Sequence, residues 1–485
     1  MASLLVAVVV SFGLILISTY AIQLINDARR RLPPGPLPLP LVGNLLNIDG
    51  GKPHVSLARL AKRYGSLMSV RLGVAHAVVV SSSEAADEIY HKHKAVMADR
   101  PAIDAPPNAR WRALRKFCAT ELFAPSRLNA LRPLRQQKAQ ELLRYVADQA
   151  ERGEAVSVGD QAFTAFMNIL SGMVFSVDLD DGPSVRGLKD LAKESSVLAT
   201  APNVSDFFPA IAAADLQGVR RKMARVVAAA YQIIDQQFEQ RLRGRQAGEP
   251  NKDDMLDAVL DKEQEWRKDG SMIDRCAIKG MLMDLFFAGA GTSSSTVEWA
   301  MAELLQSPEV MKKVKRELRE VLGTKMLVEE SDIGHLPYLQ AVVKEVLRLH
   351  PPIATTFYLA EAIVQVQGYT IPKGTTIIMN IWAVHRNNDI WNDPDKFKLE
   401  RFINSSESNF SGNNCKLIPF GGGRRICPGL PLAHRAVHLI LASLLHQFNW
   451  ILPEEATKNG IDVTEKYGVV VSMAHPLKAI AECDL

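Results

Sequence analysis

The chain has 485 residues, of which 47% are hydrophobic and 23% are charged, and its formal net charge is +4. This is the balance of a globular protein with enough apolar side chains for a large core. The sequence contains no long run of basic residues and no alternation of basic with aromatic residues. We therefore predict that nucleic acid is not a partner.

The cysteines are odd in number and scattered, and no C-x-x-C pair occurs. This usage argues against a disulfide framework and against a zinc cage, and it favours a reducing compartment. The five residues are Cys118, Cys276, Cys415, Cys427 and Cys483.

The N-terminal segment is long and apolar. Residues 4–25 carry no charge, and as a helix they would be roughly 33 Å long, about the thickness of the hydrocarbon layer of a bilayer. Three arginines follow at 29–31 and would stay on the cytoplasmic side. We predict that residues 1–31 are a single-pass membrane anchor with a basic stop. A buried helix or a cleaved signal peptide is the alternative, although no basic residue precedes the apolar run as a signal peptide requires.

The next segment, residues 32–45, is rich in proline. Proline lacks a backbone N–H and disfavours a helix, so we predict an extended, semi-rigid strut between the anchor and the body. The prolines of this strut are Pro33, Pro34, Pro36, Pro38 and Pro40.

The remaining residues, 46–485, show no internal repeat and no clear linker. "LMSVRLGVAHAVVVSS" alternates and is rich in valine, which predicts a hairpin with strands at 68–72 and 76–81 and a turn at Gly73. "PYLQAVVKEVLRLH" and "STVEWAMAELL" each place apolar residues on one helical face. Short strand patterns recur at "VQVQGYTI" and "TTIIMNIW". We predict one large body that is mostly α-helical with a minor β-sheet domain.

The stretch "FGGGRRICPG", residues 420–429, surrounds Cys427 with glycines and arginines directly before a helical pattern. A cysteine thiolate can hold a heme iron, and the N–H groups of a glycine-rich turn and of a helix start stabilise such a thiolate. Arg425 supplies a cation for a heme carboxylate. We therefore predict that Cys427 is the axial ligand of a heme. A buried structural cysteine is the alternative.

This stretch resembles the heme-binding signature of the cytochrome P-450 monooxygenases. The residues that match the signature are Phe420, Gly423, Arg425, Cys427 and Gly429. "ARWRALRK" is similar to the W-x-x-x-R helix of the same family. The resemblance implies that its Trp111 and Arg115 contact the heme propionates.

Other motifs follow in the order that the family shows, so the resemblance covers essentially the whole chain. "AGAGTSSST" stands at the place of the oxygen-activating motif and contains Thr292. "KEVLR" supplies an E-x-x-R pair, Glu345 and Arg348, and "FKLERF" adds Arg401 to the structural network that the resemblance implies. From spacing alone, Glu345 and Arg348 at i and i+3 could equally be a solvated surface pair.

The resemblance implies heme b ligated by Cys427, and a monooxygenase that inserts one oxygen atom from O2 into a small lipophilic substrate. "PNVSDFFP" and "SSSTVEWAMAEL" resemble plant microsomal members, nearest the terpenoid-oxidising, geraniol hydroxylase-like group. Such an enzyme lies in the endoplasmic reticulum membrane with its body in the cytosol, in contact with membrane lipid. The chain lacks a complete phosphate-binding loop, since "FFAGAGTSS" has Ser294 at the third glycine position, so electrons come from NADPH through a separate NADPH–cytochrome reductase.

The chain departs from the family pattern at several positions. Gly291 occupies the place of an acid that in the family precedes the threonine, here Thr292. Gly291 and Thr292 are our candidate residues for catalytic proton delivery. The segment 100–111 is much shorter than usual. Tyr358 stands where a propionate-binding cation is common, and Leu399 replaces the proline of P-E-R-F.

Two other functions are compatible with these departures. A heme-thiolate isomerase or dehydratase acting on peroxides needs neither a reductase nor a proton relay, which suits Gly291. A non-catalytic membrane heme protein would tolerate the shortened segment at 100–111. The retained Thr292 favours the monooxygenase over the isomerase or dehydratase.

Overall fold

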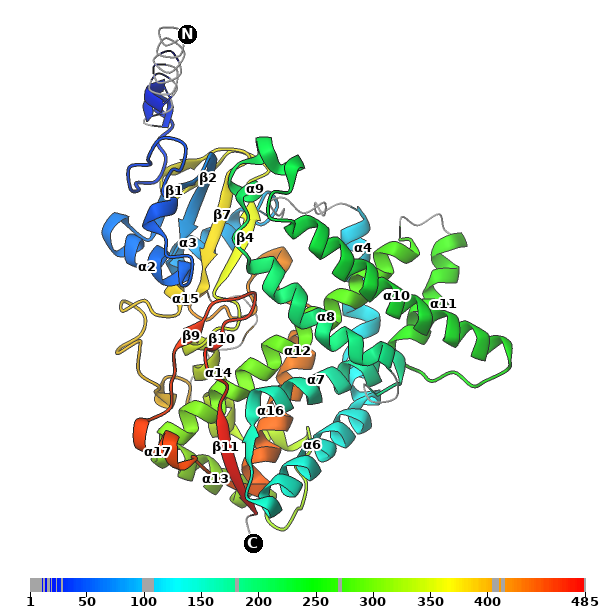
Figure 1. Ribbon diagram of the computed structural model, residues 1–485. Helices are drawn as coiled ribbons and strands as arrows, with labels where there is room; N and C mark the ends of the chain where they lie inside the picture. The colour runs from blue at the N-terminus through cyan, green and yellow to red at the C-terminus, as the bar shows by residue number, and fades with distance from the viewer. Residues whose placement is uncertain are drawn as a thin grey trace, which may run out of the picture.

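The computed structural model describes the chain apart from residues 1–10, parts of 12–28, and 98–108, 179–182, 269–272, 404–409, 411–414 and 484–485. The described residues are mostly helical with small sheets (Figure 1), as predicted. Most of the predicted membrane anchor, residues 1–31, and most of the segment 100–111 lie outside the described residues. Within the described part of the chain, no helix combines the length and the apolar character that a membrane crossing requires.

A four-stranded sheet lies toward the N-terminal end of the molecule (Figure 1), in the order β1-β2-β7-β4. β1 (Leu67–Leu72) and β2 (Ala75–Val80) form the predicted hairpin, and Gly73 turns between them with φ of 61°. β7 (Thr376–Asn380) pairs parallel to β2, and β4 (Thr355–Leu359) closes the sheet antiparallel to β7. The sheet thus joins chain segments that are distant in sequence.

The smaller sheets are antiparallel. The predicted strands in "VQVQGYTI" form the hairpin β5–β6, and a further hairpin, β9–β10, and the three-stranded sheet β3-β11-β8 complete the set within the described residues. Their bounds are β3 (Ala155–Ser157), β5 (Val364–Val366), β6 (Tyr369–Ile371), β8 (Phe448–Ile451), β9 (Glu465–Lys466), β10 (Ser472–Met473) and β11 (Lys478–Cys483).

The helices make up the remainder of the body (Figure 1). Most of the large core lies between them. Their bounds are α2 (Pro53–Tyr64), α3 (Ser83–Asp87), α4 (Ala109–Phe117), α5 (Pro125–Ala130), α6 (Arg132–Arg152), α7 (Val158–Phe175), α8 (Pro183–Thr200), α9 (Val204–Phe207), α10 (Val219–Gln246), α11 (Met255–Lys268), α12 (Arg275–Gln306), α13 (Pro308–Leu322), α14 (Pro337–Leu349), α15 (Ile381–Val384), α16 (Leu430–Gln447) and α17 (Glu454–Asn459).

Helix α12 is the central helix of this body. It begins after Asp274, whose carboxylate accepts the N–H of Ala277 at 2.8 Å, and it ends before Pro308, since the residue before a proline disfavours the helical conformation. It packs against α7, α10, α14 and α16. The side chains from 293 to 302 are buried, including Trp299, so this half of α12 forms the middle of the core.

Helix α14 buries the apolar face that the sequence predicts. All five apolar residues of this face are buried: Leu339, Val342, Val343, Val346 and Leu347. The helix starts with Pro337 in its first turn, where the missing N–H costs no helical hydrogen bond.

The proline-rich segment 32–45 is extended with a tight turn and lies along β1. Ser69 donates its N–H to the carbonyl of Pro34 at 2.9 Å, and the Asn44 side chain donates to the carbonyl of Pro36 at 3.1 Å. Gly35 approaches Ser69 so closely that a Cβ at Gly35 would lie 1.9 Å from its carbonyl oxygen. The segment is therefore fixed to the sheet by backbone contacts.

Candidate active site

The loop that carries Cys427 folds back on itself before α16. Gly421 and Gly423 adopt positive φ values of 70° and 60°, which favour glycine. Cys427 donates its N–H to the carbonyl of Phe420 at 2.9 Å, and this bond closes the loop. Gly429 then leads directly into α16, so Cys427 lies next to the N-terminus of that helix.

Tyr90 packs against the glycines of this loop from the π-helical turn Glu88–Lys92. A Cβ on Gly422 would lie 2.6 Å from the Tyr90 ring, which real Cβ atoms do not tolerate. The Tyr90 hydroxyl forms a hydrogen bond of 3.2 Å with the hydroxyl of Tyr358, and both residues are buried. Tyr358 therefore supports the loop together with Tyr90. No sequence pattern indicates Tyr90, because the fold brings it to the loop from a distant segment.

Cys427 has an electrostatic setting that the buried Cys415 lacks. Burial raises the pKa of its thiol, but the backbone N–H groups of Gly429 and Leu430 and the guanidinium of Arg115 oppose this shift. By contrast, burial and the charge of Asp87 raise the pKa of Cys415 to about 12. Of these two thiols, Cys427 is the one placed among groups that stabilise a thiolate.

The predicted propionate-binding residues gather beside this loop. Trp111 and Arg115 lie on α4, and the guanidinium of Arg425 stacks over the Trp111 ring at 4.1 Å from its centre. Arg115 donates a hydrogen bond to the carbonyl of Ile426, the residue before Cys427. The structure therefore brings the guanidinium groups of Arg115 and Arg425 and the indole of Trp111 to the loop. The two guanidinium groups are the cations that carboxylate binding requires.

Thr292 lies where α12 changes from accessible to buried. Asp284 and Ala288, on preceding turns, are exposed, Thr292 is half-buried, and the residues from Ser293 onward are buried. The Thr292 hydroxyl donates to the carbonyl of Ala288 at 2.8 Å. Accessible space thus borders the turn of α12 that carries this hydroxyl.

The two glycines next to Thr292 have different surroundings. A Cβ on Gly289 would lie 2.9 Å from the Leu170 side chain of α7, so close packing of the two helices explains this glycine. A Cβ on Gly291 would make ordinary contacts, at 3.5 Å from Val470 and 3.9 Å from Phe163. Packing therefore does not require a glycine at 291.

Glu345, Arg348 and Arg401 form a buried network. Arg348 donates two hydrogen bonds to the Glu345 carboxylate, at 2.7 and 2.8 Å, and neither side chain is exposed. Arg401 donates to the same carboxylate at 3.3 Å. This arrangement excludes a solvated surface pair. Leu399, at the start of the short helix Leu399–Arg401, is buried beside it.

A family model described as cytochrome P450 matches residues 33–479. The chain belongs to the cytochrome P450 family. Geraniol 8-hydroxylase of Catharanthus roseus is 42% identical over 481 residues, which cover 95% of this chain and 96% of that enzyme. Oryzalexin D synthase of Oryza sativa subsp. japonica is 41% identical over 469 residues, 93% and 92% of the two chains, and ferruginol synthase of Isodon rubescens is 39% identical over 476 residues, 94% and 96%.

Membership of the P450 family confirms several predictions. Enzymes of this family are oxidoreductases that use heme ligated by a cysteine thiolate, receive electrons from a redox partner and insert oxygen from O2 into a substrate. The mostly helical P450 fold with small sheets is confirmed with them. The roles of individual residues stay predictions, which the observed arrangement supports.

The residues of the loop fit a P450 heme. The thiol of Cys427 is a ligand that heme iron accepts, and the cations of Arg115 and Arg425 suit the two heme carboxylates. The alternative of a dinucleotide-binding loop in "FFAGAGTSS" is wrong, because these residues lie inside the continuous helix α12 and not between a strand and a helix.

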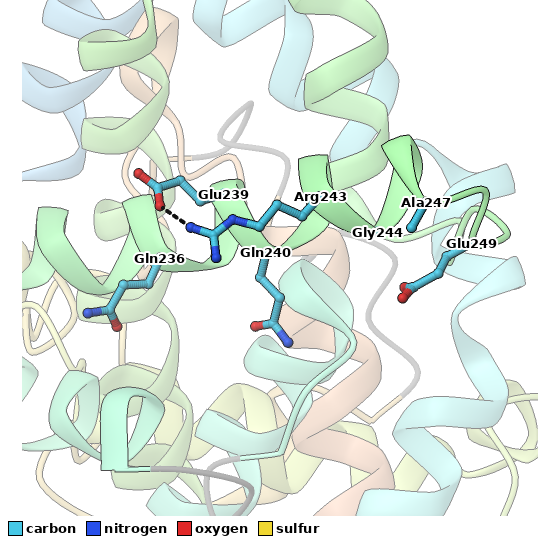
Figure 2. A pocket seen from close by; sticks show the side chains of 7 residues that line it. All are labelled: Gln236, Glu239, Gln240, Arg243, Gly244, Ala247 and Glu249. Carbon is cyan, nitrogen blue, oxygen red and sulfur yellow. Dashed lines mark hydrogen bonds and ion pairs between the residues drawn. The ribbon is translucent and has the colours of Figure 1, made fainter.

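A polar groove of about 490 Å³ lies elsewhere, on α10 and the loop that follows it (Figure 2). Its side chains include the ion pair between Arg243 and Glu239 at 3.0 Å. The residues that line it are Gln236, Glu239, Gln240, Arg243, Gly244, Ala247 and Glu249. None of them belongs to a P450 motif, so we do not assign this groove to the P450 reaction.

Proposed function

We propose that this P450 is a membrane-anchored monooxygenase that hydroxylates a small terpenoid or related lipophile, with Cys427 as the heme ligand. The observation that carries this proposal is the closed loop that holds Cys427 at the start of α16, beside Arg115. The substrate class rests on the relatives, since two of them are geraniol 8-hydroxylases and geraniol is a small lipophilic alcohol.

The overall reaction divides one O2 molecule between two products. One oxygen atom enters a C–H bond of the substrate and the other leaves as water, which consumes two electrons and two protons. A thiolate-ligated heme, when bound, supplies the cleavage of the O–O bond. NADPH supplies the electrons through a separate NADPH–cytochrome reductase, because "FFAGAGTSS", the stretch that imitates a dinucleotide-binding loop, lies inside the helix α12.

The side chains around the loop have separate tasks in this reaction. The guanidinium groups of Arg115 and Arg425 would hold the heme carboxylates, and Trp111 fixes the plane of Arg425 by stacking. Arg115 also contributes positive charge near the Cys427 sulfur, which favours the thiolate. Thr292 Oγ1, which donates to the Ala288 carbonyl at 2.8 Å, would supply a hydroxyl proton donor beside the heme.

The proposed location is the endoplasmic reticulum membrane, with residues 1–31 as the anchor and the body in the cytosol. Contacts at the junction support a fixed orientation: Arg71 forms an ion pair with Asp27 at 2.6 Å, and the Tyr20 hydroxyl donates to the carbonyl of Pro38 at 2.6 Å. Large apolar side chains next to this junction are exposed, and membrane lipid would cover them. They are Leu37, Leu39, Leu41 and Leu46.

The absorption spectrum of the reduced, CO-treated protein tests the assignment of the ligand. A thiolate-ligated heme shifts the Soret band strongly to the red, and Cys427→Ala should abolish this shift. Cys415→Ala is the matched control, because Cys415 is a buried cysteine that precedes the same loop. Retention of the red-shifted band in Cys427→Ala would show that another residue is the ligand.

Removal of residues 2–31 tests the location separately. The shortened protein should leave the membrane fraction to a large extent and should keep the red-shifted band of the CO complex. Loss of the band in a well-folded shortened protein would count against an anchor that is separate from the catalytic body.

A further inference from the structure

Three side chains that can bind a metal meet outside the heme loop. Asp87 ends α3, His91 lies one turn later in the π-helical turn Glu88–Lys92, and Cys415 comes from the segment that precedes the heme loop. One ligand atom from each of the three residues lies within 4.8 Å of the others. The fold brings them together from two distant segments, and no sequence spacing indicates them.

The three donors form a site with a buried base and an open mouth. Cys415 is 4% exposed, whereas the side chains of Asp87 and His91 are 51% and 38% exposed. The Nδ1 atom of His91 lies 2.9 Å from Oδ1 of Asp87, so the nitrogen and oxygen donors already converge. A metal ion can therefore enter from solvent and reach the thiol, and a water molecule can complete its coordination.

We propose that Asp87, His91 and Cys415 bind a zinc ion, with one water molecule as the fourth ligand. A cysteine sulfur, an imidazole nitrogen and a carboxylate oxygen are the donors that zinc takes in proteins. Magnesium and calcium require oxygen ligands and do not match this set. Tetrahedral zinc with bonds of about 2.0–2.3 Å places its ligands about 3.3–3.8 Å apart, so small side-chain rotations suffice. The thiol proton passes to solvent when the sulfur binds.

The position of this site gives the zinc a structural role toward the heme loop. Tyr90 lies between Asp87 and His91 in sequence and packs against Gly422 and Gly423 of the loop. A zinc ion bound to both segments would fix the turn that carries Tyr90 to the chain that leads into the loop. We expect zinc to slow the transfer of heme from this protein to an excess of apomyoglobin.

Equilibrium dialysis with zinc tests the site on the full-length, heme-loaded protein after treatment with a chelator. The wild type should bind one zinc ion per heme, and Cys415→Ser and His91→Gln should each weaken the binding at least ~10-fold. The matched controls are Cys276→Ser, an exposed cysteine, and His93→Gln, which lies two residues beyond His91. Both controls should bind zinc as the wild type does.

The outcome is decided by comparison among the variants. The site would be overturned if Cys415→Ser and His91→Gln bound zinc as tightly as the wild type. It would also be overturned if the control variants Cys276→Ser and His93→Gln lost as much zinc affinity as these two variants. His91→Gln changes a partly exposed side chain, so it decides the question even where Cys415→Ser fails to fold. The CO spectrum of each variant shows that it has folded and kept its heme. An unchanged rate of heme transfer despite tight zinc binding would overturn the structural role.

Discussion

Glu345 and Arg348 form a bidentate ion pair whose side chains are fully buried. The guanidinium also donates to the carbonyls of His385 and Pro394, at 2.9 and 2.7 Å, and the carboxylate accepts the N–H of Lys398 at 2.9 Å. The pair therefore joins α14 to the segment that leads toward the heme loop. Because both side chains are fully buried, loss of either partner leaves the other charge buried without compensation.

The first prediction concerns this pair. Glu345→Gln and Arg348→Lys should each lower the free energy of unfolding by roughly 3–5 kcal/mol, because a buried charge loses its partner or its fork-shaped geometry. Urea unfolding followed by far-UV circular dichroism measures this change, and heme content should fall in parallel. Glu309→Gln is the matched control, since Glu309 pairs with Lys312 on an exposed helix surface and should leave the midpoint unchanged.

The second prediction concerns the contact between Tyr90 and the heme loop. Gly422→Ala would place a methyl group 2.6 Å from the Tyr90 ring, so we expect a loss of about 1–3 kcal/mol in stability and a loss of bound heme. Gly50→Ala is the control, because a Cβ at Gly50 meets no atom within 4 Å. Thermal unfolding and heme content measure both. Normal heme content in Gly422→Ala would show that the loop can move away from Tyr90 without cost.

The sequence predicts best those features that repeat along the chain. The period of two in residues 68–81 predicts the hairpin, and the apolar face of α14 predicts the helix and its buried side. The spacing of Glu345 and Arg348 allows pairing but cannot tell a buried pair from a surface pair, because burial depends on segments that pack from elsewhere. The same limit hides Tyr90, which reaches the heme loop through the sheet domain and carries no local pattern.

The third prediction concerns the buried carboxyl of Glu298 on α12. Burial raises the pKa of Glu298 from 4.5 to about 7, although its Oε1 accepts the N–H of Leu477 at 2.9 Å. Since the folded state keeps the proton to a higher pH than the unfolded state, stability should fall as the pH rises from about 4.5 to about 7. The loss attributable to this group is up to roughly 3 kcal/mol.

Glu298→Gln tests this pH dependence because the amide oxygen can still accept the N–H of Leu477. Urea midpoints at pH 5 and pH 8 should differ less in the variant than in the wild type, and the variant should be the more stable protein at about pH 8. The control is Glu309→Gln, on the exposed surface, which should keep the wild-type pH dependence. Glu303→Gln would not serve, because Glu303 pairs with His350. A Glu298→Gln variant that is less stable at pH 8 would show that the charged carboxylate is the stabilising form.

The last prediction concerns Gly291 and proton delivery at Thr292. The resemblance to the P450 oxygen-activating motif implies an acid at the position of Gly291, and general acid groups typically contribute ~10²–10⁴-fold to a rate. Because Gly291 leaves no carboxylate at this position, we expect protons to arrive through Thr292 and water, and the wild type to release much of its reducing power as hydrogen peroxide. Gly291→Asp should raise the product formed per NADPH consumed, and Thr292→Ala should lower it.

The structure provides a matched control for this experiment, since a Cβ at Gly291 meets Val470 and Phe163 only at ordinary contact distances. Gly291→Ala adds the same Cβ without the carboxylate, and it should leave the coupling unchanged while it stabilises α12 by about 0.5–1 kcal/mol. NADPH, hydrogen peroxide and product are measured together with reductase and a bound substrate. A tightly coupled wild type that Gly291→Asp impairs, while Gly291→Ala does not, would disprove the missing-acid argument. The proton path would then run through another group, such as a hydroxyl of the substrate itself.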